Sequence, residues 1–182
     1  MNRNTDNSVN AQGLADAAAK AAKRGGLPPV HLWDPPYCGE MDMEIRADGS
    51  WWHEGSPIGR PAMVRLFSTI LKREGDRHYL VTPVEKVGIR VVDAPFVAVD
   101  ADIAPDAITF TTNVGDTVTA GPDDPIRVVM QDGTPRPYVH VRAGLMALID
   151  RKTFYRLAAA ATEGPDGRIG LRSGGAFFPL DG

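Results

Sequence analysis

The feature that most constrains the fold of this chain is a similarity of the sequence to itself at an offset of 91 positions. The offset is half of the 182 residues. Between positions 58 and 84 the offset preserves apolar spacing and an arginine before each predicted helix. The identities pair Ile58 with Ile149, Arg60 with Arg151, Arg65 with Arg156, Leu66 with Leu157, Arg77 with Arg168 and Leu80 with Leu171. We interpret the match as duplication of one structural unit. Duplicated units usually pack together, so we expect a ligand cleft at their interface.

Composition and charge narrow the class of protein. An apolar content of 43% with 24% charged residues is typical of a globular protein with its own core. A net charge of −3 without a basic run argues against a nucleic-acid partner. No stretch approaches the ~20 apolar residues of a membrane span. Cys38 is the only cysteine, which excludes an intramolecular disulfide and favours a cytoplasmic location.

The pattern along the chain predicts an N-terminal arm over residues 1–26. Strong helix formers occupy 11–24, but their apolar side is mostly alanine, so we expect weak anchoring. Four prolines between residues 27 and 39 then favour an extended path. Trp33 and Tyr37 are expected to supply its burial.

Residues 27–96 are predicted to form an N-terminal α+β unit. Asp48-Gly49 indicates a hairpin, and strands are expected over 78–82 and 87–92. A helix over 60–73 is predicted from one apolar face. That face consists of Met63, Leu66, Phe67, Ile70 and Leu71.

Residues 97–182 are predicted to form a related C-terminal α+β unit. Turn signals indicate two hairpins, 108–112 with 117–120 and 126–130 with 138–141, and two closing strands, 169–172 and 176–180. Between them Asp150 is placed to cap a helix whose apolar face is Phe154, Leu157, Ala158 and Ala161. The predicted fold class is therefore α+β, with two related units of antiparallel strands around one main helix each.

Arg60 and Arg151 carry the main functional hypothesis. A cation at a helix N-terminus is disfavoured by the helix dipole, so something must compensate for it. A bound phosphate or carboxylate would do so, because an arginine and free backbone N–H groups both suit an anion. The alternative, slightly favoured, is an ion pair with an internal carboxylate such as Glu85 or Asp93.

Two neighbouring segments extend the candidate site. The aromatic run before Arg60 includes Trp52 and His53 and suits a planar ligand, although at least one of its two tryptophans is expected in the core. Thr82 and Ser173 occupy nearly equivalent places in the repeat, and Glu85 and Lys86 follow Thr82. These hydroxyls are either polar contacts for a ligand or ordinary turn residues, and the latter is commoner.

Catalytic and metal signals are weak. His53 with Glu85 is a candidate pair for a hydrolase, yet no spacing defines a triad. The four histidines lie in separate segments and lack the spacing of a metal motif. We therefore predict no catalytic residue, no metal and no cofactor.

A set of motifs resembles an uncharacterised bacterial family. The motifs are 52–60 with Trp52, His53, Gly55, Pro57, Ile58 and Arg60; Thr82-Pro83-Val84-Glu85-Lys86; Asp93-Ala94-Pro95-Phe96; Thr112-Asn113; Pro137-Tyr138-Val139; Arg142, Gly144 and Leu145; Arg151, Phe154 and Tyr155; and Ser173 to Phe178. Together they resemble the domain-of-unknown-function 1285 family. The resemblance implies two related units, the second superficially like a pleckstrin-homology fold, a nucleotide-type ligand site at their interface, and a role in signalling. On these motifs the candidate site gains Asn113, Tyr138, Arg142 and Tyr155.

The prediction is a non-enzymatic, cytoplasmic protein that binds a nucleotide-like or other anionic small molecule in bacterial signal transduction. One alternative is a protein-interaction module that uses a sheet edge or the N-terminal arm, with a homo-oligomer or protein partner. The other is an uncharacterised hydrolase.

Overall fold

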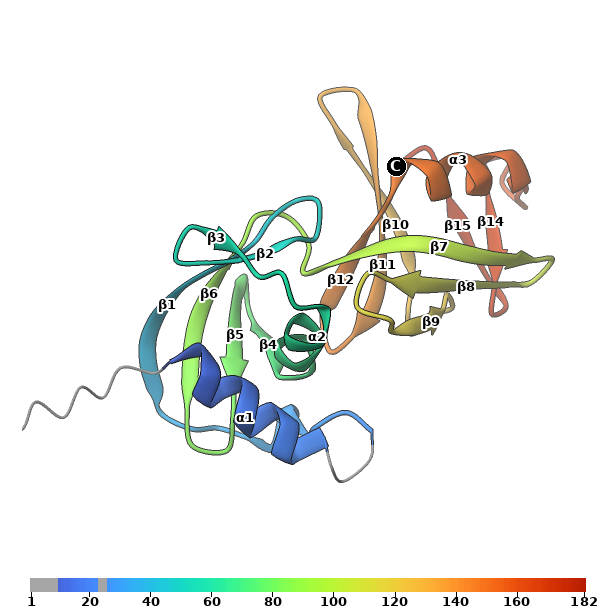
Figure 1. The fold of residues 1–182 in the computed structure, drawn as a ribbon. Helices are drawn as coiled ribbons and strands as arrows, with labels where there is room; N and C mark the ends of the chain where they lie inside the picture. The colour runs from blue at the N-terminus through green and yellow to red at the C-terminus, as the bar shows by residue number, and fades with distance from the viewer. Residues whose placement is uncertain (1–9, 23–25) are drawn as a thin grey trace, which may run out of the picture. The chain divides into compact units, whose positions relative to one another are not determined.

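The computed structural model describes residues 10–22 and 26–182, an α+β arrangement (Figure 1). Residues 1–9 and 23–25 of the predicted N-terminal arm lie outside the described residues. The helices are α1 Ala11–Ala22, the 3-10 helix η1 Val30–Leu32, α2 Pro61–Thr69 and α3 Arg151–Ala160. The strands are β1 Tyr37–Ile45, β2 Trp51–His53, β3 Ser56–Pro57, β4 Leu71–Glu74, β5 Arg77–Val81, β6 Lys86–Val91, β7 Phe96–Ala104, β8 Ala107–Thr112, β9 Thr117–Thr119, β10 Ile126–Gln131, β11 Thr134–Arg142, β12 Leu145–Ile149, β13 Thr162–Glu163, β14 Ile169–Ser173 and β15 Ala176–Pro179.

Internal contacts divide the described chain into two compact units. The first unit holds the described residues up to Glu44 together with Trp51–Arg90, and the second holds Ile45–Ser50 and Val91–Gly182. The turn between β1 and β2 therefore belongs to the second unit. Asn113 connects it there, because its side-chain amide donates to the Gly49 carbonyl at 3.2 Å and its side-chain oxygen accepts from the Val97 amide at 3.0 Å.

The first unit is built on a six-stranded sheet with the order β3-β2-β1-β6-β5-β4. The predicted hairpin about Asp48-Gly49 is confirmed, since it joins the neighbouring strands β1 and β2. The central strands β1 and β6 run in the same direction. Arg90 on β6 pairs with Asp42 on β1 at 2.9 Å, and two residues further on Val92 donates to Ile45 at 2.9 Å. The sheet is thus mixed rather than wholly antiparallel.

Helix α1 is held more firmly than its alanine content led us to expect. Leu14, Ala15 and Ala18 are almost completely buried, and α1 packs on α2. Small side chains let the two helices approach closely, so a face of alanines still buries its surface.

Aromatic anchoring of the first unit also differs from the prediction in part. Trp51 is buried as expected and stacks on Phe67 with ring centroids 6.0 Å apart. Tyr37, however, is 49% exposed, and its ring packs edge-on against Tyr79 on the sheet surface. The extended segment 27–39 is therefore not held by burial of Tyr37, and Trp33 is only partly buried.

Helix α2 ends at Thr69, four residues before the predicted end. Ile70 and Leu71 are buried as the pattern required, but Leu71 begins β4 and pairs with Leu80 on β5. The helical period and the strand both place Leu71 in the core. Pairing with β5 decides between them, and this non-local contact is not visible in a local pattern.

The second unit holds a six-stranded sheet with the order β10-β11-β12-β7-β8-β9. The two predicted hairpins are present as β8–β9 and β10–β11. Strands β7 and β12 were not predicted and lie at the centre, where Ala147 pairs with Phe96 in a parallel ladder. The predicted α+β class is confirmed, and the sheet is mixed where antiparallel strands were expected.

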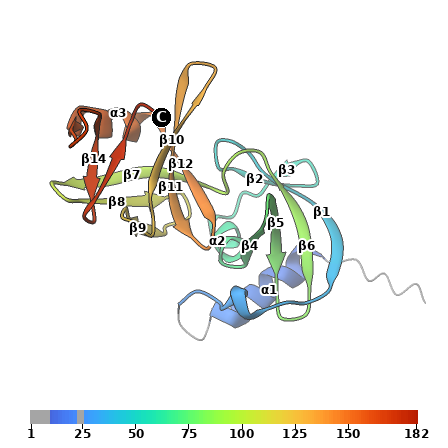
Figure 2. The same ribbon diagram turned by 180° about the vertical axis from the view of Figure 1, so that it is seen from behind.

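Helix α3 begins as predicted, because the Asp150 carboxylate accepts a hydrogen bond from the Thr153 amide at 2.8 Å. Its buried residues are Thr153 and Leu157, whereas Phe154 is only partly buried and Ala158 is exposed. The buried face is therefore turned by one residue from the prediction. Next to α3, β13, β14 and β15 form a three-stranded sheet (Figure 2).

The 91-residue repeat reappears in the strand pairing. Leu80 pairs with Val87 between β5 and β6, and Leu171 pairs with Phe178 between β14 and β15. Both partners of the first pair are shifted by 91 positions in the second. Each unit therefore contains a helix, α2 or α3, that is followed by three antiparallel strands with a matching hairpin register. Within the part of the chain that the structure describes, no helix is long and apolar enough to cross a membrane.

Candidate functional site

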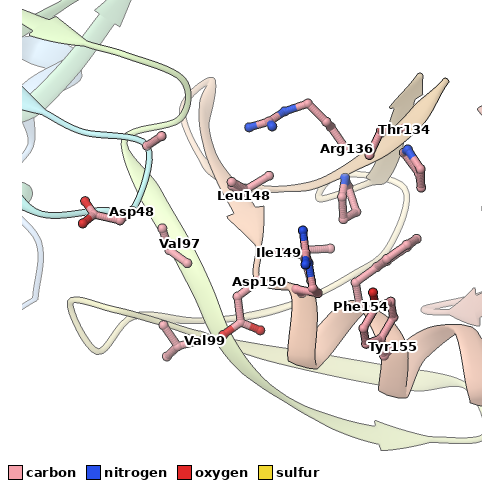
Figure 3. Close-up of a pocket in the computed structure, with 14 residues that line it drawn as sticks. Asp48, Val97, Val99, Thr134, Arg136, Leu148, Ile149, Asp150, Phe154 and Tyr155 are labelled. Carbon is pink, nitrogen blue, oxygen red and sulfur yellow. The ribbon is translucent and has the colours of Figure 1, made fainter. Parts of the chain in front are cut away.

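The second unit contains a pocket of about 920 Å³ between α3, the β10–β11 hairpin and the β1–β2 turn (Figure 3). It is lined by Ala47, Asp48, Val97, Val99, Thr134, Pro135, Arg136, Pro137, Leu148, Ile149, Asp150, Arg151, Phe154 and Tyr155. Its volume falls within the roughly 300–1,000 Å³ of small-molecule sites.

The pocket exists because two neighbouring segments separate. Strand β12 ends at Ile149 and the chain turns into α3, while β11 continues along β10 to the hairpin turn. Residues Thr134–Arg136 consequently pair with β10 and have no partner in β12. Figure 1 shows the hairpin reaching beyond the rest of its sheet. Asp132 and Gly133, with φ of 50° and 76°, form the tight turn at its tip.

Aliphatic and aromatic side chains form most of the pocket wall. Val97, Leu148 and Ile149 come from the central strands, and Phe154 and Tyr155 come from α3 (Figure 3). Tyr155 is 64% exposed, so its ring is available to a ligand. These residues suit the apolar or planar body of a small molecule.

Arg136 is held at one side of the pocket by a polar cluster. Its guanidinium donates to the Asp93 carboxylate and to the Tyr138 hydroxyl, and Tyr138 in turn donates to Asp93 at 2.7 Å. Burial and the bond to Asp93 raise the pKa of Tyr138 above its usual value, although Arg136 opposes them. The bonds to Tyr138 and Asp93 raise the pKa of Arg136, so it stays charged.

The two carboxylates of the lining also have partners. Asp150 caps α3. Asp48 accepts hydrogen bonds from the Ser50 hydroxyl at 2.6 Å and from the Ser50 amide at 2.9 Å, which lower the pKa of its carboxyl. Both groups are therefore occupied in holding the backbone.

Arg151 is different from the other charged residues of the lining. It is exposed, and within residues 10–22 and 26–182 its guanidinium has no ion pair or hydrogen bond. Asp93, one of its suggested partners, is bonded to Arg136 and Tyr138 instead. The pocket thus has one cation whose charge the described protein does not compensate.

The structure brings only part of the predicted site together. Arg151 and Tyr155 line the pocket, and Tyr138 lies directly behind Arg136. Arg142 pairs with Asp116 and lies over the Phe96 ring at 5.0 Å.

Asn113 and Ser173 serve the backbone. Ser173 is fully buried, donates to the Ala120 carbonyl and accepts from the Ile108 amide, both at 2.8 Å. Asn113 holds the β1–β2 turn as described above. Neither lines the pocket.

The remaining predicted residues lie in the first unit and do not line this pocket. Thr82 is buried and accepts hydrogen bonds from the Val84 and Glu85 amides, which fits the turn interpretation. Lys86 donates to Glu74 at 3.0 Å and lies over the Tyr79 ring.

Trp52, His53 and Arg60 complete that set. Trp52 and His53 are partly buried on β2, and His53 approaches Glu54 at 3.9 Å rather than Glu85. Arg60 is the exposed N-cap residue of α2. Among the described residues no three histidine, cysteine, aspartate or glutamate side chains are grouped to hold a metal ion.

Sequence reasoning missed Asp48, Thr134, Arg136 and Phe154 as pocket residues. The lining residues of β11, Thr134 to Pro137, form the β11 wall of the pocket. Its signal in the sequence was two prolines at alternate positions, 135 and 137, within a predicted hairpin. Proline is confined to strand edges, so this pattern indicates an unpaired side. Phe154 was assigned to the core because its helical spacing fitted that role as well.

The fold and site define a two-unit α+β protein with a small-molecule-sized pocket in its second unit. The N-terminal model of the domain of unknown function DUF1285 matches residues 28–94, and the C-terminal DUF1285 model matches residues 95–180. The chain belongs to the DUF1285 family.

Two solved structures support this assignment. A DUF1285 family protein from Silicibacter pomeroyi DSS-3 is 58% identical, with a TM-score of 0.86 over 95% of this chain and 96% of that chain. A DUF1285 family protein from Shewanella baltica OS155 is 27% identical, with a TM-score of 0.52 over 63% of this chain and 87% of that chain. No curated protein matches the chain.

Proposed function

We propose that the second unit binds a nucleotide-like or other small anionic molecule in its pocket, as a non-enzymatic ligand sensor in signal transduction. The observation that carries the proposal is the charge balance of the lining. Asp48, Arg136 and Asp150 have partners, and Arg151 has none within the described chain. The charge missing from the pocket is therefore negative.

The size and chemistry of the pocket support the same ligand class. A volume of about 920 Å³ accommodates a mononucleotide or an aromatic acid. Phe154 and Tyr155 offer rings beside Arg151 on α3. Stacking of a base on an aromatic side chain contributes roughly 1–3 kcal/mol, and an arginine fork suits a phosphate or carboxylate.

The absence of an assembled reactive group in the lining favours binding over catalysis. Among the described residues the lining contains no histidine, cysteine or serine, and its carboxylates are engaged in a helix cap and a turn. The proposed role therefore requires recognition of the ligand and no bond cleavage.

Titration of the isotope-labelled full chain with nucleoside monophosphates and aromatic carboxylates tests the proposal by NMR. We expect the amide signals of Leu148–Tyr155 and of the β10–β11 hairpin to shift in a saturable manner. If none of these compounds shifts the signals of the lining residues, the proposal is wrong.

A further inference from the structure

The β11 wall of the pocket has an unusual hydrogen-bonding character. Backbone N–H and C=O groups point alternately to the two sides of a strand. In β11 the His140 amide donates to the Pro125 carbonyl at 3.1 Å, on the β10 side. The pairing with β10 is unbroken from Val139 to Thr134. The backbone N–H and C=O groups of the even-numbered residues from 134 to 140 therefore point toward β10. Those of the odd-numbered residues point away from it.

The backbone groups of Pro135 and Pro137 both face away from β10. Because Tyr138 pairs with Leu148, the Pro137 carbonyl lies opposite the Ile149 amide and belongs to the β11–β12 ladder, so Pro135 is the residue of this side that lies beyond the ladder. Proline has no N–H group. Beyond the ladder this side of the strand therefore presents the Pro135 carbonyl as an acceptor and no backbone donor. Pro135 and Pro137 both line the pocket, so its β11 wall has the same character.

This wall excludes one ligand class. An extended peptide that adds to a sheet edge needs N–H donors as well as carbonyl acceptors from that edge. The two prolines remove every donor between Thr134 and Pro137 on the open side. Strand addition at this edge is therefore blocked, although the edge is not covered by β12.

The same wall selects among small molecules. A carbonyl that loses water and meets no donor is destabilising, so a ligand must offer N–H or O–H groups to it. A ligand that presents only acceptors leaves the Pro135 carbonyl unpaired and faces its negative end. Sites built on such polar groups reject analogues that lack the matching group.

We infer that the ligand combines an anionic group, which pairs with Arg151, with an N–H or O–H donor on its planar body, which pairs with the backbone carbonyl at Pro135. This inference rests on the proposed function and specifies the chemistry of the ligand in the same pocket.

The test uses two matched pairs of probes, adenosine 5′-monophosphate with purine riboside 5′-monophosphate, and 4-aminobenzoate with benzoate. The second member of each pair keeps the anion and the ring and lacks the exocyclic amine. Titration calorimetry or NMR on the full chain should show at least about tenfold tighter binding of the amine-bearing member of a pair.

Pro135→Ala supplies the protein-side control, because it restores one N–H to the open side of β11. We expect the preference for the amine to fall several-fold in this variant, and in Pro135→Gly if Pro135→Ala does not fold. Arg151→Gln should weaken both members of a pair equally and leave the preference unchanged.

The possible results separate the two proposals. Equal affinity of paired probes in the wild-type protein, with both lost in Arg151→Gln, overturns the donor requirement and leaves the anion site in place. An amine preference that persists unchanged in the folded Pro135 variant also overturns it. Binding of neither pair overturns the proposed function and the donor requirement with it.

Discussion

The Tyr138 hydroxyl donates a hydrogen bond to the Asp93 carboxylate at 2.7 Å, and this contact ties the pocket hairpin to the segment that leads into β7. Arg136 bonds to both groups, so the three side chains act as one cluster. The cluster therefore fixes the position of the β11 wall beside the pocket.

Removal of the hydroxyl should loosen that wall. We expect Tyr138→Phe to lower the free energy of unfolding by about 1–2 kcal/mol, since a hydrogen bond to a charged group is lost and the site is partly exposed. Urea denaturation measures the change. Tyr155→Phe is the matched control, because its 64% exposed side chain has no hydrogen-bond partner among the described residues. Equal stability of Tyr138→Phe and the wild type would show that the cluster does not hold the hairpin.

The cluster also predicts a dependence on alkaline pH. Burial, aided by Asp93, raises the pKa of Tyr138 above 10.0 in the folded protein. The folded state then binds this proton more tightly than the unfolded state, so the contribution of Tyr138 to stability is complete below pH 10 and disappears as the pH rises through the folded pKa. The difference between phenolate absorbance titrations of the wild type and Tyr138→Phe isolates this group. A midpoint below pH 10 in that difference would contradict the assignment.

Ser173 should be one of the most sensitive polar positions. Its hydroxyl bonds to two buried backbone groups, the Ile108 amide and the Ala120 carbonyl. Ser173→Ala leaves both without a partner, and we expect a loss of about 2–4 kcal/mol in thermal or chemical unfolding. The exposed Ser56 gives the control variant Ser56→Ala, for which we expect a change below about 0.5 kcal/mol. A ligand role for Ser173 would instead predict altered binding without this large destabilisation.

Adjacent glycines after β14 provide a further comparison. Gly174 and Gly175 both have positive φ, 59° and 79°. A Cβ on Gly174 would lie 2.8 Å from the Ala120 carbonyl oxygen, whereas a Cβ on Gly175 meets nothing within 4 Å. Both alanine variants carry backbone strain, and we expect Gly174→Ala to lose about 1–3 kcal/mol more than Gly175→Ala through the added clash. Equal unfolding midpoints of the two alanine variants would show that the Ala120 backbone moves to make room for the added Cβ.

Local signals predicted the hairpins and the helix starts well. Asp132-Gly133 forms the expected turn and Asp150 forms the expected cap, because both depend on residues close in sequence. Strands β7 and β12 were missed since their parallel pairing joins Phe96 to Ala147 across the second unit. Such pairing leaves no turn signal, and buried strands lack the alternation of exposed ones.

The candidate site was predicted only in part for a related reason. Arg151 was found because the repeat made its position at a helix start visible, and the structure places it at the pocket. Arg136 and Asp48 approach the same pocket from the β11 hairpin and the β1–β2 turn, which no local pattern connects. Thr82 and Ser173 shared a position in the repeat, and both support the backbone.

The affinity of Arg151→Gln for adenosine 5′-monophosphate tests the central claim most directly. Lys152→Gln is the matched control, since it removes an adjacent exposed cation that does not line the pocket. We expect calorimetry to show binding to the wild type and to Lys152→Gln, and an affinity at least about tenfold weaker, or ~1.4 kcal/mol, for Arg151→Gln. Equal affinity of Arg151→Gln and the wild type, or no binding to any of the three proteins, would contradict the account.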